Sequence, residues 1–166
     1  MKEIIFRKIK PKDWQEYKKI RLEALQEEPI AFGASYEEKI IENENNWKIS
    51  IKKSSIFFAL DNDEIIGIMG YWFETNLKTK HIAKIFGVYL KEKYRKKGIG
   101  DKFLKFILKQ IIQNKEIKKI ALAVNTKQKG AIKLYEKNGF EIVGKLKNEL
   151  FYSGQFYDEF LMEKYL

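Results

Sequence analysis

A basic turn with two glycines is the part of the chain whose residue types and spacing could do chemistry. Its sequence is Arg95-Lys96-Lys97-Gly98-Ile99-Gly100. Apolar residues follow at helical spacing, at Phe103, Leu104, Ile107, Leu108, Ile111 and Ile112. A strand leading through such a turn into a helix presents backbone N–H groups and the positive end of the helix dipole to one point. Gly98 and Gly100 have no Cβ, so a pyrophosphate could approach their backbone closely.

Two other phosphate-binding motifs are excluded. The Rossmann fingerprint needs a third glycine, and Phe103 stands at that position. A P-loop needs Gly-Lys followed by Ser or Thr, a sequence that the chain does not contain. The turn alone is also typical of an ordinary surface connection, so its interpretation depends on the segments around it.

A second block of informative residues lies downstream. The apolar segment over residues 117–124 predicts a short buried strand. Asn125 and Thr126 are typical N-cap residues for the helix that follows, and Asn138-Gly139 is a typical helix end. The helix itself carries Ala131, Leu134 and Tyr135.

The two blocks together resemble the GNAT superfamily of N-acetyltransferases. Arg95-x-x-Gly98-x-Gly100 is similar to its acyl-CoA-binding signature, and the second block follows in the family's order. The resemblance covers essentially the whole chain and implies an acetyl-CoA-dependent N-acetyltransferase, with acetyl-CoA as cosubstrate and no metal. The segments over residues 21–38 and 154–162 are similar to a bacterial and archaeal subgroup whose amine substrates, small molecules or protein N-termini, are seldom defined.

The resemblance also implies roles for particular residues. We expect Tyr135 to lie near the CoA sulfur and to protonate the leaving thiolate, because a phenol pKa of about 10 keeps it protonated. Backbone groups of Val88, Tyr89 and Leu90 should bind the pantetheine arm and polarise the thioester carbonyl. The other predicted CoA-binding residues are Arg95, Lys96, Lys97, Gly98, Ile99, Gly100, Asn125 and Ala131, with Tyr135 also in contact.

The general base is an open question in the sequence. Many relatives carry a glutamate on the strand before the pyrophosphate turn, but residues 82–90 contain none. The candidates are Glu37, Glu38, Glu74 and His81, each also typical of an ordinary solvated residue. We place Glu38 in the catalytic role. We place Phe32, Glu37 and Glu38 in the acceptor pocket, where the two carboxylates would recognise a cationic amine.

The hydrophobic pattern predicts one domain over residues 1–166 with an α/β (α+β) fold. The elements follow in the order β-α-α-β-β-β-α-β-α-β-β, and the resemblance implies a mixed, mostly antiparallel sheet of about seven strands flanked by four helices. The expected strands cover residues 2–9, 55–60, 65–73, 81–90, 118–124, 140–149 and 155–164. The expected helices cover residues 11–26, 36–52, 98–113 and 127–138. Ser153-Gly154 predicts a hairpin turn.

Composition narrows the function classes. The net charge is +10, but all except three of the 33 cationic residues are lysines spread along the chain, so nucleic acid is not the expected partner. The dense cluster over residues 91–97 suits the phosphates of CoA. With no cysteine and only His81, disulfides, thiolate metal sites and multi-histidine metal sites are excluded.

Location, assembly and acceptor are the remaining expectations. Residues 1–7 lack a secretory apolar region, and the apolar run over residues 65–73 is too short to span a bilayer, so we expect a cytoplasmic protein without a membrane partner. Aromatic residues near the end, Phe151, Tyr152, Phe156 and Tyr157, could form a homodimer seam or line the acceptor cleft. The acidic second helix favours a polyamine acceptor, whereas the overall charge favours an anionic or zwitterionic one. A catalytically silent CoA-binding module is the alternative to an enzyme.

Overall fold

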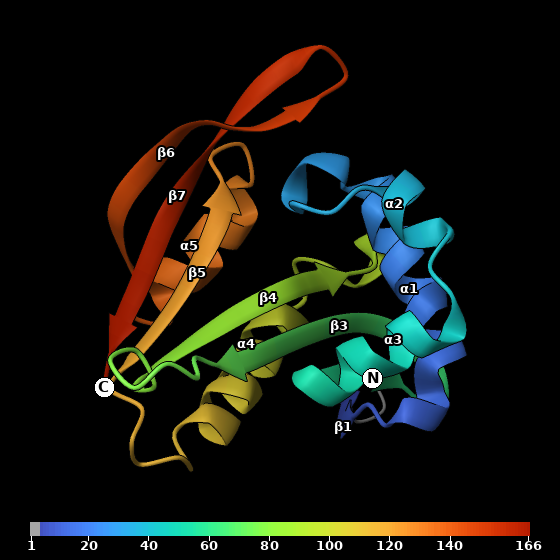
Figure 1. Cartoon of the computed structure of the whole chain (residues 1–166), viewed down its shortest axis with the longest axis horizontal. Coiled ribbons are helices and arrows are strands. Elements are labelled where there is room, and N and C mark those ends of the chain that lie inside the picture. Colours follow the sequence, from blue (N-terminus) through green and yellow to red (C-terminus); the bar gives the residue numbers. More distant parts are fainter. Residues whose placement is uncertain (1–3) are drawn as a thin grey trace.

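The computed structural model describes residues 4–166, and a seven-stranded sheet forms its centre (Figure 1). The strands lie in the order β1-β2-β3-β4-β5-β7-β6. Their bounds are β1 (Ile4–Lys8), β2 (Ser55–Asp61), β3 (Glu64–Phe73), β4 (Ile82–Leu90), β5 (Lys119–Asn125), β6 (Glu141–Tyr152) and β7 (Gln155–Tyr165). All neighbouring strands pair antiparallel except β4 and β5, which run parallel. The predicted mixed, mostly antiparallel sheet is therefore confirmed.

Five α-helices are present in the described residues, one more than predicted. They are α1 (Trp14–Glu27), α2 (Tyr36–Ile40), α3 (Glu44–Lys53), α4 (Ile99–Ile111) and α5 (Lys129–Lys137), with short 3-10 turns η1 (Pro11–Asp13), η2 (Pro29–Ala31) and η3 (Glu92–Tyr94). The helix predicted over residues 36–52 is divided in two. Asn43 is the N-cap of α3 and accepts a hydrogen bond from the Asn46 N–H (3.0 Å), so a new helix starts there. Residues 2 and 3 of the first predicted strand lie outside the described residues.

The helices cover both faces of the sheet. Side chains alternate between the faces along β2, as the two-residue period of a strand requires. Ile56 and Phe58 pack with α1 and α3, whereas Phe57 and Ala59 pack with α4 and α5. The amphipathic pattern of α4 is confirmed, since its apolar stripe lies in the second of these cores.

The sheet opens between its two parallel strands. β4 and β5 pair only through Ile82↔Lys119, Ala83↔Ile120 and Lys84↔Ala121, and they then diverge, as Figure 1 shows. Beyond this point β4 contains a bulge, because Phe86 pairs with Gly70 while Tyr89 pairs with Ile68. Gly87 lies in the bulge with φ +63°, a conformation that favours glycine. The opening and the bulge set the position of the site described below.

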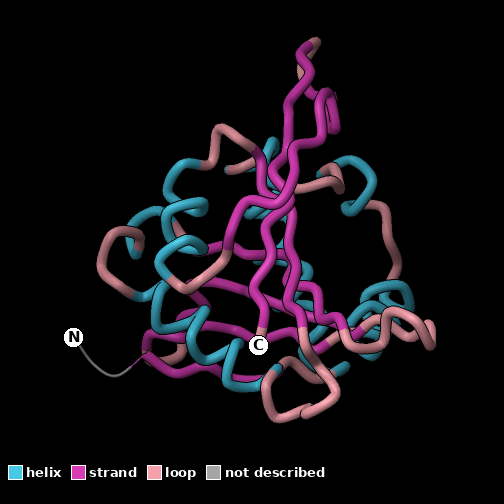
Figure 2. The backbone as a smooth tube through the Cα atoms, turned by 90° about the vertical axis from the view of Figure 1, so that its left-hand side faces the viewer, coloured by secondary structure: helices cyan, strands magenta, loops and turns pink. Residues whose placement is uncertain are grey.

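The hairpin of β6 and β7 projects beyond the rest of the sheet (Figure 2). Ser153 and Gly154 form its turn with φ +49° and +77°, which confirms the predicted hairpin turn. Phe151 and Phe156 pair across the hairpin and are both more than half exposed. A homodimer through these rings stays a prediction. No helix in residues 4–166 is long and apolar enough to cross a membrane.

Candidate active site

A cavity of about 630 Å³ lies beside the predicted phosphate-binding turn; we call it the loop cavity. β4, the 95–100 turn, the end of β5 and α5 supply most of its wall. The predicted CoA-binding residues that line it are Val88, Tyr89, Leu90, Arg95, Lys96, Gly98, Gly100, Ala131 and Tyr135. Three others, Lys97, Ile99 and Asn125, do not line it. Ile99 is 2% exposed within the core, and the Lys97 ammonium lies over the Tyr94 ring.

The backbone of the turn is shaped to receive an anion. Lys96 and Gly98 both have positive φ, +59° and +77°, and Gly98 is the N-cap of α4. Alternating conformations of this kind turn successive N–H groups toward one side, and the first N–H groups of α4 have no intrahelical partner. A Cβ on Gly98 would meet no atom within 4 Å, so glycine is favoured there by the backbone conformation alone.

Arg95 holds the turn in place. Its Nε donates to the Leu90 carbonyl (2.7 Å), and its Nη1 pairs with Glu28. The other oxygen of Glu28 accepts from the Gln128 amide (3.0 Å). One carboxylate at the end of α1 therefore joins the segments that precede α4 and α5. Arg95 lines the cavity, but its guanidinium is already engaged with protein groups.

Tyr135 lies at the inner end of α5 and is 4% exposed. Its ring packs edge-on against Phe140, with 5.9 Å between the ring centroids. Burial raises the pKa of the Tyr135 hydroxyl above its ordinary value, so the group stays protonated across the physiological range. A proton donor on the wall of the loop cavity is thus available.

Asn125 is fully buried and connects two segments. Its Nδ2 donates to the Ile30 carbonyl (2.9 Å), and its Oδ1 accepts from the Lys127 N–H (2.9 Å). The carbonyl lies in η2, and the N–H lies just before α5. The structure therefore places Asn125 behind the cavity wall, where it fixes two segments that face the cavities.

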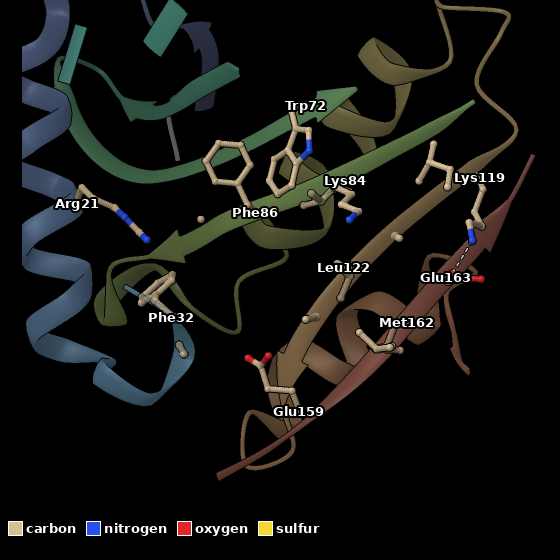
Figure 3. Close-up of a pocket in the computed structure, with 18 residues that line it drawn as sticks. Arg21, Phe32, Trp72, Lys84, Phe86, Lys119, Leu122, Glu159, Met162 and Glu163 are labelled. Carbon is tan, nitrogen blue, oxygen red and sulfur yellow. Dashed lines mark hydrogen bonds and ion pairs between the residues drawn. The ribbon is translucent and has the colours of Figure 1, made fainter. Parts of the chain in front are cut away.

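A second cavity, of about 550 Å³, lies on the other side of the opening; we call it the strand cavity (Figure 3). Arg21, Phe32, Trp72 and Glu159 contribute to its wall from α1, the segment after η2, β3 and β7. The two cavities share the residues Ala31, Phe32, Ile85, Phe86, Gly87, Leu122 and Ala123. They therefore adjoin each other at the point where β4 and β5 have separated.

Among the charged side chains that line the strand cavity, some form salt bridges within the described residues and Glu159 does not. Lys84 pairs with Glu74 and Lys119 pairs with Glu163, each at 2.8 Å. Glu159 forms no salt bridge with any residue in the range 4–166. Burial raises the pKa of Glu159, and the nearby charge of Glu149 adds to the rise. Glu159 is thus the carboxylate on this wall with the highest affinity for a proton.

None of the four residues considered as general base lines either cavity. Glu38 forms a capping box with Ser35, and the hydrogen bond from the Ser35 N–H (3.0 Å) lowers its pKa. Glu37 and His81 are exposed. The hydrogen bond from Lys84 lowers the pKa of Glu74. The catalytic role of Glu38 stays a prediction that this geometry does not favour. Phe32, by contrast, lines both cavities.

The sequence analysis covered Arg21 and Glu159 only as members of the segments 21–38 and 154–162, and it gave neither residue a function. Both belong to the segments that resemble a GNAT subgroup, and that was their only signal in the sequence. Their elements are α1 and β7, which lie more than a hundred residues apart in the chain. Only the folded sheet brings them to one cavity.

The arrangement places an anion-binding turn and a second cavity beside one opening within the sheet. The family model "Acetyltransferase (GNAT) family" matches residues 5–140, so the chain belongs to the GNAT family. GNAT acetyltransferases use acetyl-CoA as their cosubstrate. The residues of the loop cavity fit this cosubstrate, since the turn backbone can receive its pyrophosphate.

Individual relatives agree with this assignment. Mycothiol acetyltransferase of Corynebacterium efficiens is 29% identical over 91 residues, which are 55% of this chain and 29% of that protein. The chain thus spans less than a third of this relative. A GNAT acetyltransferase from Streptococcus pneumoniae has the same fold, with TM-score 0.87, 23% identity and coverage of 99% and 100% of the two chains. yncA from Salmonella typhimurium, solved with its cofactor acetyl-CoA, gives TM-score 0.84 and 14% identity over 99% and 94%.

Proposed function

We propose that the protein transfers the acetyl group of acetyl-CoA directly to the primary amine of a small molecule or peptide. One observation carries the proposal: the loop cavity and the strand cavity meet where β4 and β5 separate. A cosubstrate in the first cavity and an acceptor in the second would then present their reacting atoms to each other without a covalent enzyme intermediate. Holding two reactants in this way removes much of the entropic barrier.

The loop cavity would hold acetyl-CoA through its backbone. The 95–100 turn and the α4 N-terminus bind the pyrophosphate. The pantetheine arm lies along Val88, Tyr89 and Leu90, whose edge no longer pairs with β5. The thioester carbonyl lies at the β4 bulge, where backbone N–H groups can polarise it.

The chemistry needs two proton transfers. The amine nitrogen attacks the carbonyl carbon, the C–N bond forms and the C–S bond breaks. Glu159 takes the proton that the amine loses, because its raised pKa makes it a stronger base than an ordinary carboxylate. Tyr135 gives its proton to the leaving thiolate. We assign the base to Glu159 in place of Glu38, since Glu38 lies outside both cavities.

The test is thiol release from acetyl-CoA across a panel of amino acids, polyamines, aminoglycosides and N-terminal peptides. Turnover with one amine class is expected. Tyr135→Phe should lower kcat by about 10- to 100-fold, because the thiolate leaves without its proton donor. Acetyl-CoA affinity, measured by calorimetry, should stay within about twofold, since one hydroxyl adds little to a long ligand. Tight acetyl-CoA binding with no turnover on any amine would instead support a silent CoA-binding module.

A further inference from the structure

Arg21 is a cation on the wall of the strand cavity and forms no salt bridge within the part of the chain that the structure describes. Its side chain points from α1 into the cavity, as Figure 3 shows. Its Nη1 is shut off from solvent and has no hydrogen-bond partner among residues 4–166. Its guanidinium carbon lies 4.3 Å from the centre of the Phe32 ring, so the group is stacked and fixed. The backbone of the β4 bulge lies beside it, since a Cβ on Gly87 would be 4.0 Å from Nη1.

A buried charge without a partner is costly, and proteins rarely keep one. Burial lowers the pKa of Arg21, the direction expected for a cation that no anion stabilises. The guanidinium nevertheless stays charged, because arginine does not lose its proton in proteins. The other two cations on this wall, Lys84 and Lys119, already have carboxylate partners. Arg21 is the cation on this wall without a carboxylate partner among residues 4–166, and because Nη1 is shut off from solvent, a ligand would meet the other guanidinium nitrogens.

We propose that the acceptor amine carries an anionic group, a carboxylate, which pairs with Arg21 while Glu159 receives the amine. This inference rests on the proposed function and narrows its substrate class. Figure 3 shows Arg21 and Glu159 reaching into the cavity from opposite walls. A small zwitterion of the amino-acid type would therefore satisfy both charges at once.

The same charges disfavour the other acceptors. A polyamine would bring a second ammonium toward Arg21, and like charges repel in a site of low dielectric. A peptide N-terminus would place a neutral amide there and would leave the guanidinium unpaired. A binding site with a buried polar group discriminates against ligands that lack the group complementary to it, because the polar group is then left unpaired. The acidic second helix and the overall charge favour different acceptors, and the proposed pairing with Arg21 favours a zwitterion over a polyamine.

The first experiment compares kcat/KM for amino acids with that for their primary amides, in several side-chain sizes. We expect the amino acid to be preferred by about 10- to 100-fold, the range for a charged hydrogen bond that is lost on burial. The amide has the less basic amine and would react faster if no anion site existed. Aminophosphonate analogues in the same assay distinguish a carboxylate site from one for a doubly charged phosphonate. Equal rates for acid and amide would overturn the proposal.

Variants at Arg21 test whether this residue causes the preference for amino acids over their amides. Arg21→Gln should reduce the acid-to-amide ratio to about one, and Arg21→Lys should restore part of it, because the charge returns without the planar fork. Lys84→Gln is the matched control, since Lys84 lines the same cavity but is already paired, and it should keep the wild-type ratio. Melting curves check that each variant is folded. An unchanged ratio in Arg21→Gln would contradict the assignment.

A binding measurement separates this inference from the proposed function. Trp72 lines the strand cavity, so its fluorescence can report N-acetyl amino acids and their amides, with Trp72→Phe as the blank. We expect the N-acetyl amino acid to bind at least tenfold more tightly than its amide, and only when Arg21 is present. Such binding without turnover on any amine would keep the anion site and refute the transferase. Turnover without a preference for the amino acid over its amide would support the transferase and refute the anion site.

Discussion

The loop cavity and the strand cavity are built in different ways. The loop cavity takes its anion-binding part from one short stretch, the 95–100 turn and the start of α4, and it uses mainly backbone groups. The strand cavity takes its charged groups from α1 and β7 and uses side chains. In the proposed function, acetyl-CoA would thus be bound by one local stretch of sequence, whereas the acceptor would be bound by residues that only the complete fold brings together.

Removal of the Glu159 carboxylate should give the largest effect and would test the chemistry of the strand cavity. Glu159→Gln should lower kcat/KM by about 100- to 1000-fold, because the general base is lost, while acetyl-CoA affinity stays unchanged. Glu163→Gln, on the same strand and paired with Lys119, should show a far smaller loss. Similar losses in both variants would remove the base role from Glu159.

The pH dependence of activity and stability is a second test of the proposed base role of Glu159. Because the pKa of Glu159 is raised in the folded protein, its carboxylate lowers stability at pH values above that pKa. The acid limb of kcat/KM should therefore have its midpoint above the ordinary glutamate value of about 4.3. Glu159→Gln should melt at a higher temperature than wild type at pH 7, and this advantage should shrink as the pH falls through the raised pKa and vanish below the ordinary glutamate value.

Asn125 allows a test of both cavities at once, because its hydrogen bonds hold one segment beside each cavity. Asn125→Ala should lower the free energy of unfolding by about 2 kcal/mol, since two buried hydrogen bonds to Ile30 and Lys127 are lost. The position of the segment near Phe32 should become less fixed, so the KM for both substrates should rise. Urea denaturation gives the stability and steady-state kinetics the KM values. A rise in only one KM would show that the two cavities are positioned independently.

The smallest expected effect tests the backbone character of the loop cavity. Gly98→Ala should weaken acetyl-CoA binding by about tenfold, because a residue with a Cβ resists positive φ at a cost of roughly 1–2 kcal/mol. Gly154→Ala is a matched control: it has the same φ of +77° and equally open space, but it lies at the hairpin tip. Calorimetry should show that only Gly98→Ala affects binding, although both variants lose stability. Equal acetyl-CoA affinity in the two would refute the role of the turn.

The fold was largely predictable, for physical reasons. Strand and helix periods in the hydrophobic pattern identified every strand and four helical regions. The break between α2 and α3 was missed because Asn43 lies inside an otherwise helical pattern, where one side-chain hydrogen bond decides the matter. Patterns of this kind report burial well and local caps poorly.

The candidate site was predictable only in part. The 95–100 turn could be recognised from the sequence, because its glycines allow a backbone conformation that binds anions and its lysines add positive charge nearby. Glu38 is acidic and close to the expected pocket, but its carboxylate caps α2, a use that composition does not reveal. Asn125 has the right place in the chain but faces inward. The proposed roles of Arg21 and Glu159 depend on their burial and on their positions across the strand cavity from each other. Neither property can be predicted from the residues next to them in the sequence.

Among the described residues, the three residue pairs between β4 and β5 are the whole strand pairing between the half-sheet of β1 to β4 and the half-sheet of β5 to β7. One hydrophobic core, shared with α4 and α5, nevertheless spans both half-sheets, and Glu28 and Asn125 link them across the opening. The sheet is therefore open at its backbone edges but closed by packing on this face, so two reactants can meet inside it without a break in the core.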